Sequence, residues 1–431
     1  MIPIPEIELK TTQEIKKFQE DLLKKQLVYL NENSPYYSSL FKNYNIDIQE
    51  INSLEDLHKI PVTTKDDLQK YNDEFLCVDK AKIADYVTTS GTLGDPVLIA
   101  LSENDLNRLA YNEELSFQCT GLSEKSVIQL TTTMDRRFMA GLAYFLGARK
   151  SGIGIVRVGS GIPELQWDTI KRINPDTLIC VPSFLLKLIE FAEENNIDYR
   201  NSSVKKAICI GEPLRNQDFT DNVLAAKIKS KWPIELYSTY ASTEMATAFT
   251  ECKQGLGGHF HPELIICEFL DENHNSVQEN EVGELVITTL GVEAMPLLRY
   301  KTGDLFKPHF EKCGCGRTTF RLSPLIGRKQ QMIKYKGTSL YPPSLLDLLN
   351  NFGEIKHYVI EVFSNEIGED ELLIKVFSPE KTKELTDKIK DKFRAKVRVS
   401  PHIEFVTEQE IIQIKFPENS RKSITFIDKR K

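Results

Sequence analysis

Short β-rich segments alternate with helical ones through the middle of the chain, and this alternation limits the possible folds more than any other feature. The β-rich runs are VIQLTTT, IGIVRVG, TLICVP, KAICIG and IELYSTY. Helical segments separate them, such as PSFLLKLIEFAEEN, whose apolar residues recur at helical spacing. Strands joined by helices in this way form a mostly parallel sheet. We therefore predict an α/β fold in which a large N-terminal domain of several subdomains contains this sheet.

The pattern changes twice after this region. Between roughly residues 263 and 308, strand-like runs and turn residues follow one another closely, which is more typical of antiparallel or barrel structure. After Gly327 the chain has the pattern of a smaller α+β unit, with a helix near Pro343–Asn351 and further elements in HYVIEVF, ELLIKVF, TKELTDKIKDKFRAK, HIEFV and SITFID. We predict an N-terminal domain over residues 1–328 and a small, mobile C-terminal domain over residues 329–431.

Two segments near the N-terminus are predicted to contain helices. In TTQEIKKFQEDLLKKQLVYLNENSPYYSSLF the apolar spacing predicts one helix, capped by Thr11 or Thr12 and ended by Asn33, Ser34 and Pro35. The next segment, SLEDLHKIPVTTKDDLQKY, predicts two short helices separated at Pro61.

Composition excludes several classes of protein. Apolar residues make up 41% and charged residues 27% of the 431, the balance of a globular protein. With 55 basic and 62 acidic residues the net charge is −7, so we expect no nucleic-acid partner. No apolar run is long enough to cross a bilayer, and MIPIPEIELK does not resemble a signal peptide. The eight cysteines then suggest reduced thiols or metal ligands, and we expect a cytoplasmic protein without a membrane partner.

Three segments carry residues suited to phosphate and nucleotide chemistry. In Thr88–Pro96 (TTSGTLGDP), glycines and hydroxyls could form a nest of donors for phosphate, although a surface turn explains the same composition. In YSTYASTEM, Glu244 could hold Mg²⁺ while Tyr240 stacks on a base, or the segment could simply end a strand before a helix cap. In LRYKTGD, Asp304 could accept ribose hydroxyls or lie in an ordinary β-turn.

Two later segments are candidates for a functional role because of where they lie in the chain. Gly327 and Arg328 lie where the composition changes between domains, which suggests a hinge. Lys422 lies in the Pro/Asn/Ser-rich tail FPENSRKSI, where a lysine is normally solvated unless another domain closes over it.

The order of these motifs carries more information than any of them alone. The Ser/Thr/Gly loop, Gly211-Glu212-Pro213, Tyr-x-x-Thr-Glu, Tyr-x-Thr-Gly-Asp, Gly-Arg and a late lysine resemble the core motifs of adenylate-forming enzymes. The segments NSPYYSSLF, LEDLHKIPVTTKDDL and FPENSRKSITFIDKR resemble the opening and the end of phenylacetate-CoA ligases and their coenzyme F390 synthetase-like relatives. The resemblance spans about residues 10 to 430.

The resemblance implies an acid–thiol ligase with an adenylation domain and a mobile lid. Such enzymes join a carboxylic acid, here of an aromatic class by resemblance, to AMP from Mg-ATP. They then transfer the acyl group to a thiol, usually that of coenzyme A. The alternatives are transfer to a carrier-protein thiol or to an amine, or a nucleotide-binding protein of the same fold without ligase activity. The family also suggests a homodimer.

The resemblance assigns roles to individual residues, which fall into groups by the part of the substrate they would contact. Phosphates of ATP would be held by Ser90, Gly91, Thr92 and Gly94, and the adenine site would be formed by Gly211, Glu212, Pro213, Tyr240 and Thr243. Glu244 would bind Mg²⁺, Asp304 would bind the ribose with Arg328 nearby, Lys422 would be the adenylation lysine, and Gly337 would lie near the pantetheine tunnel. The sequence departs from the family pattern at Leu93, Ala241 and Gln330-Gln331, and the last of these weakens the hinge assignment.

A second constellation is suited to a metal. Cys252 and His259 are seven residues apart, and Cys313-Gly-Cys315 follows later in the chain. Thiolates and imidazole could complete a tetrahedral, structural zinc site without an open position. His261 could replace His259 as the fourth ligand. The simpler interpretation is that these are four unrelated residues in loops.

Overall fold

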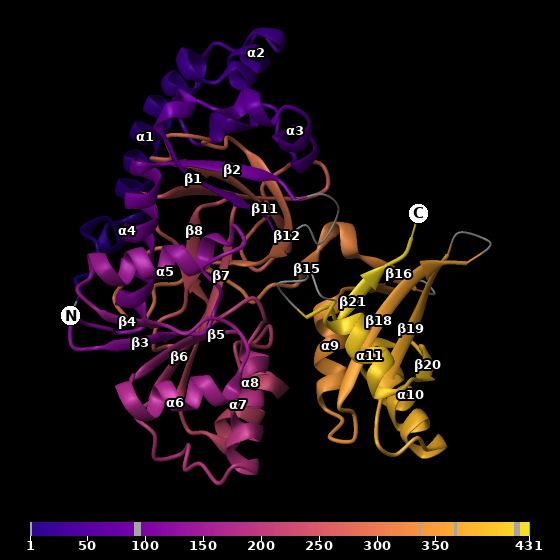
Figure 1. Ribbon diagram of the computed structural model, residues 1–431. Coiled ribbons are helices and arrows are strands. Elements are labelled where there is room, and N and C mark those ends of the chain that lie inside the picture. The colour runs from indigo at the N-terminus through magenta and orange to yellow at the C-terminus, as the bar shows by residue number, and fades with distance from the viewer. Residues whose placement is uncertain (1, 90–95, 336–337, 366–368, 418–422, 431) are drawn as a thin grey trace. The chain divides into compact units, whose positions relative to one another are not determined.

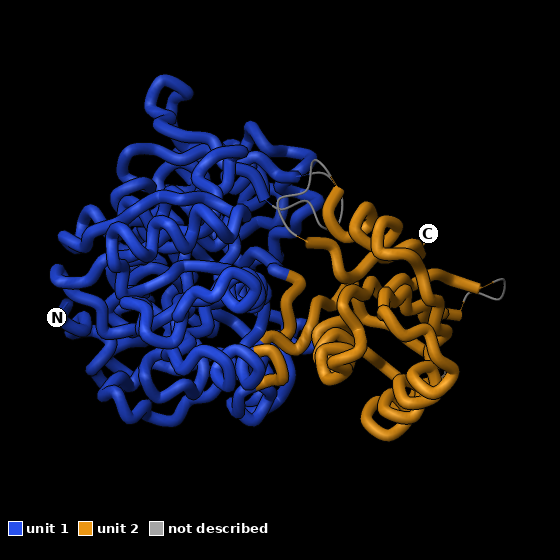
Figure 2. The backbone as a smooth tube through the Cα atoms, turned by 60° about the horizontal axis from the view of Figure 1, so that its bottom comes forward, with its two compact units in different colours: residues 1–221, 225–302, 306–324 blue, residues 222–224, 303–305, 325–431 orange. Residues whose placement is uncertain are grey.

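The computed structural model describes residues 2–89, 96–335, 338–365, 369–417 and 423–430. The chain forms two compact units (Figure 2). Unit 1 consists of Met1–Asp221, Ala225–Thr302 and Phe306–Pro324. Unit 2 consists of Asn222–Leu224, Gly303–Leu305 and Leu325–Lys431.

Unit 1 is built around a sheet with the strand order β4-β3-β5-β6-β7-β8. The strands pair in parallel from β4 to β7, and β8 is antiparallel to β7. Figure 1 shows helices on both faces, with α4 and α5 on one side and α6 and α7 on the other. The predicted α/β fold is confirmed. The bounds are β3 Val127–Leu130, β4 Gly154–Arg157, β5 Thr177–Cys180, β6 Lys206–Ile210, β7 Glu235–Ser242, β8 Thr247–Thr250, α4 Glu103–Cys119, α5 Met139–Lys150, α6 Pro163–Ile173, α7 Pro182–Glu194 and α8 Val223–Lys231.

The first N-terminal helix begins and ends close to the predicted residues, and a second helix that was not predicted follows it directly. Thr11 caps α1 (Thr12–Asn33) in a capping box with Glu14, and Ser34 separates α1 from α2 (Pro35–Asn43). The predicted short pair around Pro61 consists of the 3₁₀ turn η3 (Glu55–Lys59) and the helix α3 (Lys65–Lys70). Further 3₁₀ turns are η1 Glu6–Leu9, η2 Ile48–Glu50, η4 Asn72–Phe75 and η5 Lys80–Lys82.

The remaining strands of unit 1 are mostly antiparallel, as the strand-dense sequence predicts. A hairpin joins β1 (Ile83–Thr88) to β2 (Leu98–Ser102), and β10 (Ile265–Leu270) pairs with β11 (Gly283–Thr289). A small three-stranded sheet has the order β13-β14-β9. Its strands are β9 Gly258–His259, β13 Pro308–His309 and β14 Arg321–Leu322. Strand β12, Tyr300–Phe306, belongs to the sheet with the order β10-β11-β12-β15.

Unit 2 has its own sheet, with the order β20-β19-β18-β21, and its own apolar core, which includes Ile374, Ile389 and Phe393. The expected helices and strands of this region are present. Two features were not predicted: the hairpin of β16 and β17, and the helix α11. The bounds are β15 Gly327–Arg328, η6 Lys329–Gln331, β16 Ile333–Tyr335, β17 Thr338–Leu340, α9 Pro342–Asn350, β18 His357–Ser364, β19 Asp370–Phe377, α10 Lys383–Val397, β20 His402–Phe405, α11 Glu408–Lys415 and β21 Phe426–Asp428.

Candidate functional site

Two of the predicted nucleotide motifs meet where parallel strands end. Strand β6 ends at Ile210, which is in register with Thr239 of β7. The chain therefore continues as Gly211-Glu212-Pro213 beside Tyr240, although 26 residues lie between Pro213 and Tyr240 in the sequence. The carboxyl ends of parallel strands are the usual ligand-binding edge of an open α/β sheet. Gly211 has a φ of +80°, a conformation that glycine adopts without strain.

The carboxylate of Glu212 has a structural partner. It accepts hydrogen bonds from the backbone N–H of Ser183 at 2.8 Å and from the Ser183 hydroxyl at 2.9 Å. Ser183 lies in the first turn of α7, where unpaired N–H groups favour an anionic acceptor. Glu212 thus fixes the loop after β6 to the start of α7.

Tyr240 and Glu244 lie at the end of β7 and in the following turn. The Tyr240 ring makes an edge-on contact with Phe306, at a centroid distance of 4.6 Å. Glu244 is half-buried in the turn that leads into β8. The turn closes with a hydrogen bond from Ala246 N to Thr243 O, at 3.3 Å, and Ala246 has a positive φ of 47°. The turn therefore holds Glu244 in a defined backbone conformation.

Arg108, which was not predicted as a site residue, supports this turn. Its guanidinium is buried and donates to the carbonyls of Ala246 and Leu264, each at 2.5 Å, and to Leu290 O at 2.7 Å. A fourth hydrogen bond, at 3.1 Å, goes to Thr247 Oγ1, next to Ala246. One arginine within an amphipathic helix carries no local signal of such a role, because its partners come from distant segments.

Asp304 and Arg328 lie side by side in unit 2. They are partners in the antiparallel pairing of β12 with β15, and Arg328 Nε donates to Asp304 Oδ1 at 3.1 Å. Asp304 is buried, while Arg328 is half-buried. The arrangement brings together the two residues that the resemblance assigns to the ribose.

The remaining predicted nucleotide and acyl-transfer residues, Ser90, Gly91, Thr92, Gly94, Gly337 and Lys422, lie outside the described residues. The base of the Ser/Thr/Gly loop is described. Thr89 donates its backbone N–H to Val97 O at 3.0 Å, and its hydroxyl accepts from Val97 N at 2.9 Å. These two hydrogen bonds extend the pairing of β1 with β2 by one residue beyond Thr88 and Leu98.

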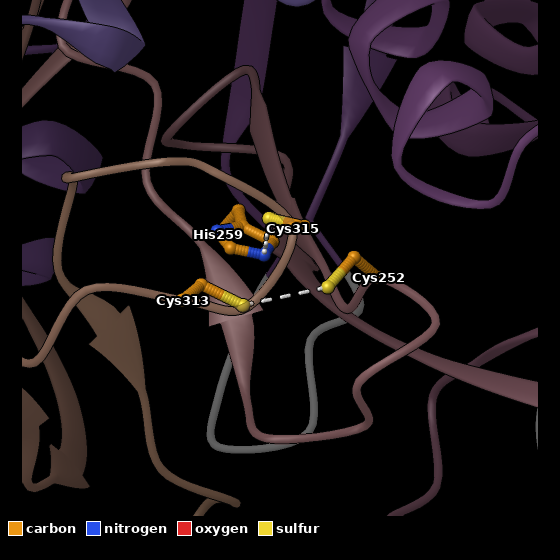
Figure 3. Close-up of side chains that lie close together, drawn as sticks. All are labelled: Cys252, His259, Cys313 and Cys315. Carbon is orange, nitrogen blue, oxygen red and sulfur yellow. Dashed lines mark hydrogen bonds between the residues drawn. The ribbon is translucent and has the colours of Figure 1, made fainter.

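The predicted metal ligands gather in one cluster. One ligand atom from each of Cys252, His259, Cys313 and Cys315 lies within 4.8 Å of the others. Cys252 Sγ is 3.6 Å from Cys313 Sγ, and Cys315 Sγ is 3.5 Å from His259 Nε2 (Figure 3). These distances match a tetrahedral zinc site, in which bonds of about 2.3 Å to sulfur and 2.0 Å to nitrogen separate two sulfurs by about 3.8 Å and sulfur from nitrogen by about 3.5 Å.

Tight turns and a short strand pairing position these four side chains. Cys252 follows β8, His259 belongs to β9, and the other two cysteines lie in the loop between β13 and β14. Within that loop, Gly316 N donates to Cys313 O at 2.9 Å. Gly257, which lies between Cys252 and His259 in the sequence, has a φ of +98°, and a Cβ there would lie 2.3 Å from Leu322 O. Only glycine fits at this approach of two backbones.

Contacts within the cluster shift the pKa values of Cys252 and Cys315 in opposite directions. Hydrogen bonds with Cys313 and Cys315, together with burial, raise the pKa of Cys252. Hydrogen bonds from Cys252 and Cys313 lower the pKa of Cys315. Burial lowers the pKa of His259 and keeps its ring neutral, as a metal ligand must be.

His261, the other candidate for the fourth ligand, points elsewhere. Its Nδ1 lies 2.5 Å from Oε1 of Glu8, and both side chains are fully buried. His259 is the histidine that lies in the cluster. Its backbone pairs with Arg321 of β14, the strand that follows the loop with Cys313 and Cys315.

Comparison with known proteins identifies the family. Residues 20–294 match the family model described as AMP-binding enzyme. The chain is 30% identical over 384 residues to a phenylacetate-coenzyme A ligase from Thermus thermophilus, covering 87% of this chain and 84% of that protein. It is 28% identical over 394 residues to a phenylacetate-coenzyme A ligase from Escherichia coli, covering 88% and 86% of the two chains.

A solved structure has the same fold. A 2-hydroxyisobutyryl-CoA ligase, crystallised in the postadenylation state with 2-HIB-AMP, superposes with a TM-score of 0.86 at 21% identity. The match covers 99% of this chain and 94% of that one. The chain therefore belongs to the AMP-binding enzymes, the adenylate-forming superfamily. Within that superfamily it is a member of the phenylacetate-CoA ligase-like subfamily. Among the described residues, no helix has both the length and the apolar character needed to cross a bilayer.

Proposed function

We propose that the protein is an AMP-forming acid–CoA ligase. It activates a carboxylic acid with ATP as an acyl-adenylate, releases pyrophosphate and transfers the acyl group to the thiol of coenzyme A. The observation that carries this proposal is the similarity to phenylacetate-coenzyme A ligase from Thermus thermophilus over 84% of that protein's length. An aromatic acid is the substrate class that this relative supports.

The predicted residues divide the chemistry among them. Gly211, Pro213, Tyr240 and Thr243 would line the adenine site beside the edge of the sheet, and Asp304, oriented by Arg328, would accept hydrogen bonds from the ribose hydroxyls. Ser90, Gly91, Thr92 and Gly94 would donate to the phosphates. Glu244 would hold Mg²⁺, which neutralises phosphate charge when bound.

Lys422 would promote the first step through its charge. An ammonium placed between the substrate carboxylate and the α-phosphate stabilises the negative charge that grows as the new bond forms. Gly337 would allow the pantetheine chain to approach closely in the second step. Carrier-protein thiols and amines remain alternative acceptors, which an acceptor assay separates from coenzyme A.

The first test is acid-dependent ATP–pyrophosphate exchange across aryl and aliphatic carboxylates, without coenzyme A. Exchange with aryl acids, followed by coenzyme A-dependent thioester formation, is the expected result. Lys422→Ala should abolish exchange, whereas Lys396→Ala, at an exposed position of α10, should not. No exchange with any acid, or full exchange by Lys422→Ala, would contradict the proposed chemistry.

We also propose that the protein works in the cytoplasm, where its eight unpaired cysteines stay reduced. A further proposal is that Cys252, His259, Cys313 and Cys315 hold a structural Zn²⁺. The cation would fix three loops to one another. Elemental analysis should find one zinc per chain after a mild chelator wash. Cys313→Ser should lower that content and Cys180→Ala, in the core of the sheet, should not; zinc-free wild-type protein would contradict the site.

A further inference from the structure

A buried charged network adjoins the four-residue metal cluster. Glu8 and His261 are 0% exposed and Arg317 is 1% exposed. The Arg317 guanidinium donates from Nε to Glu8 Oε2, from Nη2 to Gln118 Oε1 and from Nη1 to Cys315 Sγ, the last at 3.4 Å. One planar group therefore joins a candidate metal ligand to a carboxylate that lies near the start of the chain.

The backbone reinforces this connection. Thr318, next to Arg317, donates its N–H to Glu8 O at 2.9 Å and its hydroxyl to the same oxygen at 3.1 Å. The Thr318 hydroxyl also contacts Lys10 O. Arg317 O in turn accepts from Cys313 N at 3.0 Å. The segment Glu6–Lys10 and the cysteine loop consequently share a continuous set of hydrogen bonds.

Charge explains why an arginine occupies this place. Three thiolates around a divalent cation leave a net charge of about −1, which a buried guanidinium offsets. Glu8 carries a second negative charge, and its other oxygen binds His261. The three hydrogen bonds leave different nitrogens of the guanidinium at fixed angles, which a lysine ammonium does not reproduce.

We propose that Arg317 is a positioning residue of the metal site and that it couples metal occupancy to the docking of the segment Glu6–Lys10. This inference rests on the zinc proposal. Hydrogen bonds to a ligating thiolate fix its orientation and stabilise its negative charge. Loss of a group that makes such a hydrogen bond typically weakens metal binding 10- to 100-fold. Loss of the metal frees the cysteine loop, which holds Arg317 and Thr318 against Glu8, so the segment attached to Glu8 loosens.

The first experiment measures zinc affinity of the full chain by competition with a chromophoric chelator. Arg317→Lys should bind zinc roughly 10- to 100-fold more weakly than wild type. The matched control is Arg299→Lys, a buried arginine paired with Glu268 at 2.7 Å elsewhere in unit 1, and its zinc affinity should equal that of wild type. Glu8→Gln, which keeps the side-chain shape, provides a milder variant should Arg317→Lys fail to fold.

The second experiment measures amide hydrogen exchange with and without the metal. Removing zinc from wild type should speed exchange in Glu6–Lys10 and at Thr318, while α10 of unit 2 stays unchanged. In zinc-loaded Glu8→Gln the same amides should already exchange faster than in wild type. If wild type binds zinc but Arg317→Lys and Glu8→Gln leave zinc affinity and amide exchange unaltered, the role of Arg317 alone is refuted. If wild type binds no zinc, the metal site itself is refuted.

Discussion

Glu113 should make the stability of unit 1 depend on pH. Its side chain is buried in α4, where Asn112 Nδ2 donates to Oε1 at 3.0 Å. Among the described residues, Oε2 has no hydrogen-bond partner. Helix α5 packs closely here, because a Cβ on Gly147 would lie 2.4 Å from Glu113 Cβ. Burial raises the pKa of Glu113 from 4.5 to about 8.

The size of the effect follows from this difference in pKa. The fold binds a proton that the unfolded chain releases near pH 4.5, so the free energy of unfolding falls as the pH rises from about 4.5 to about 8 and is level above that. At 1.36 kcal/mol for each pH unit, the total is about 5 kcal/mol, of which about 3 kcal/mol falls between pH 5.5 and pH 8.5. Glu113→Gln has no proton to lose. It should therefore lack this fall, whatever constant cost its amide adds.

Tryptophan fluorescence during urea unfolding can measure this difference. The two tryptophans, Trp167 and Trp232, both lie in unit 1 with Glu113, and their ring centroids are 5.3 Å apart. Wild type should lose about 3 kcal/mol relative to Glu113→Gln between the two pH values. The control is Glu114→Gln, the neighbouring half-buried carboxylate, which should follow wild type. Equal pH dependence in all three proteins would refute the reasoning.

Three further substitutions test packing and the site. Gly141→Ala should destabilise unit 1 by about 1–3 kcal/mol in urea, because its Cβ would lie 2.0 Å from Thr133 O; an unchanged midpoint would argue against this packing. Arg108→Met should cost about 3 kcal/mol or more, since it leaves buried carbonyls unpaired, and it should raise the KM for MgATP by loosening the turn that holds Glu244. Asp304→Ala should weaken ATP binding roughly tenfold or more in equilibrium titration, and unaltered binding would remove its ribose role.

Local patterns account for the parts of the fold that were predicted. Helix α1 was predictable because Thr11 and Glu14 form its cap within one turn, and the parallel sheet because each strand is a short β-rich run. Helix α11 was missed although it has the same signal: Thr407 and Glu410 form a capping box. Its eight residues follow a strand closely and carry few buried apolar side chains, so the periodic pattern is weak.

The part of the candidate site that depends on the order of motifs along the chain was predictable from the sequence. The register of β6 with β7 follows from a parallel sheet, so Gly211 and Tyr240 could be expected at one edge. The choice between His259 and His261 could not be made from spacing, since both lie on one short segment. Glu8 decides it by binding His261 from 253 residues away, and no local pattern encodes such a contact.

The partners Glu8 and Arg317 are 309 residues apart along the chain, which has a consequence for synthesis. At about 5–20 residues per second, a ribosome needs roughly 15–60 s to extend the chain from one to the other. During that time the parallel sheet can form, and His261 becomes available to Glu8 before Arg317 does. The segment Glu6–Leu9 is thus synthesised long before the cysteine loop that holds it in place.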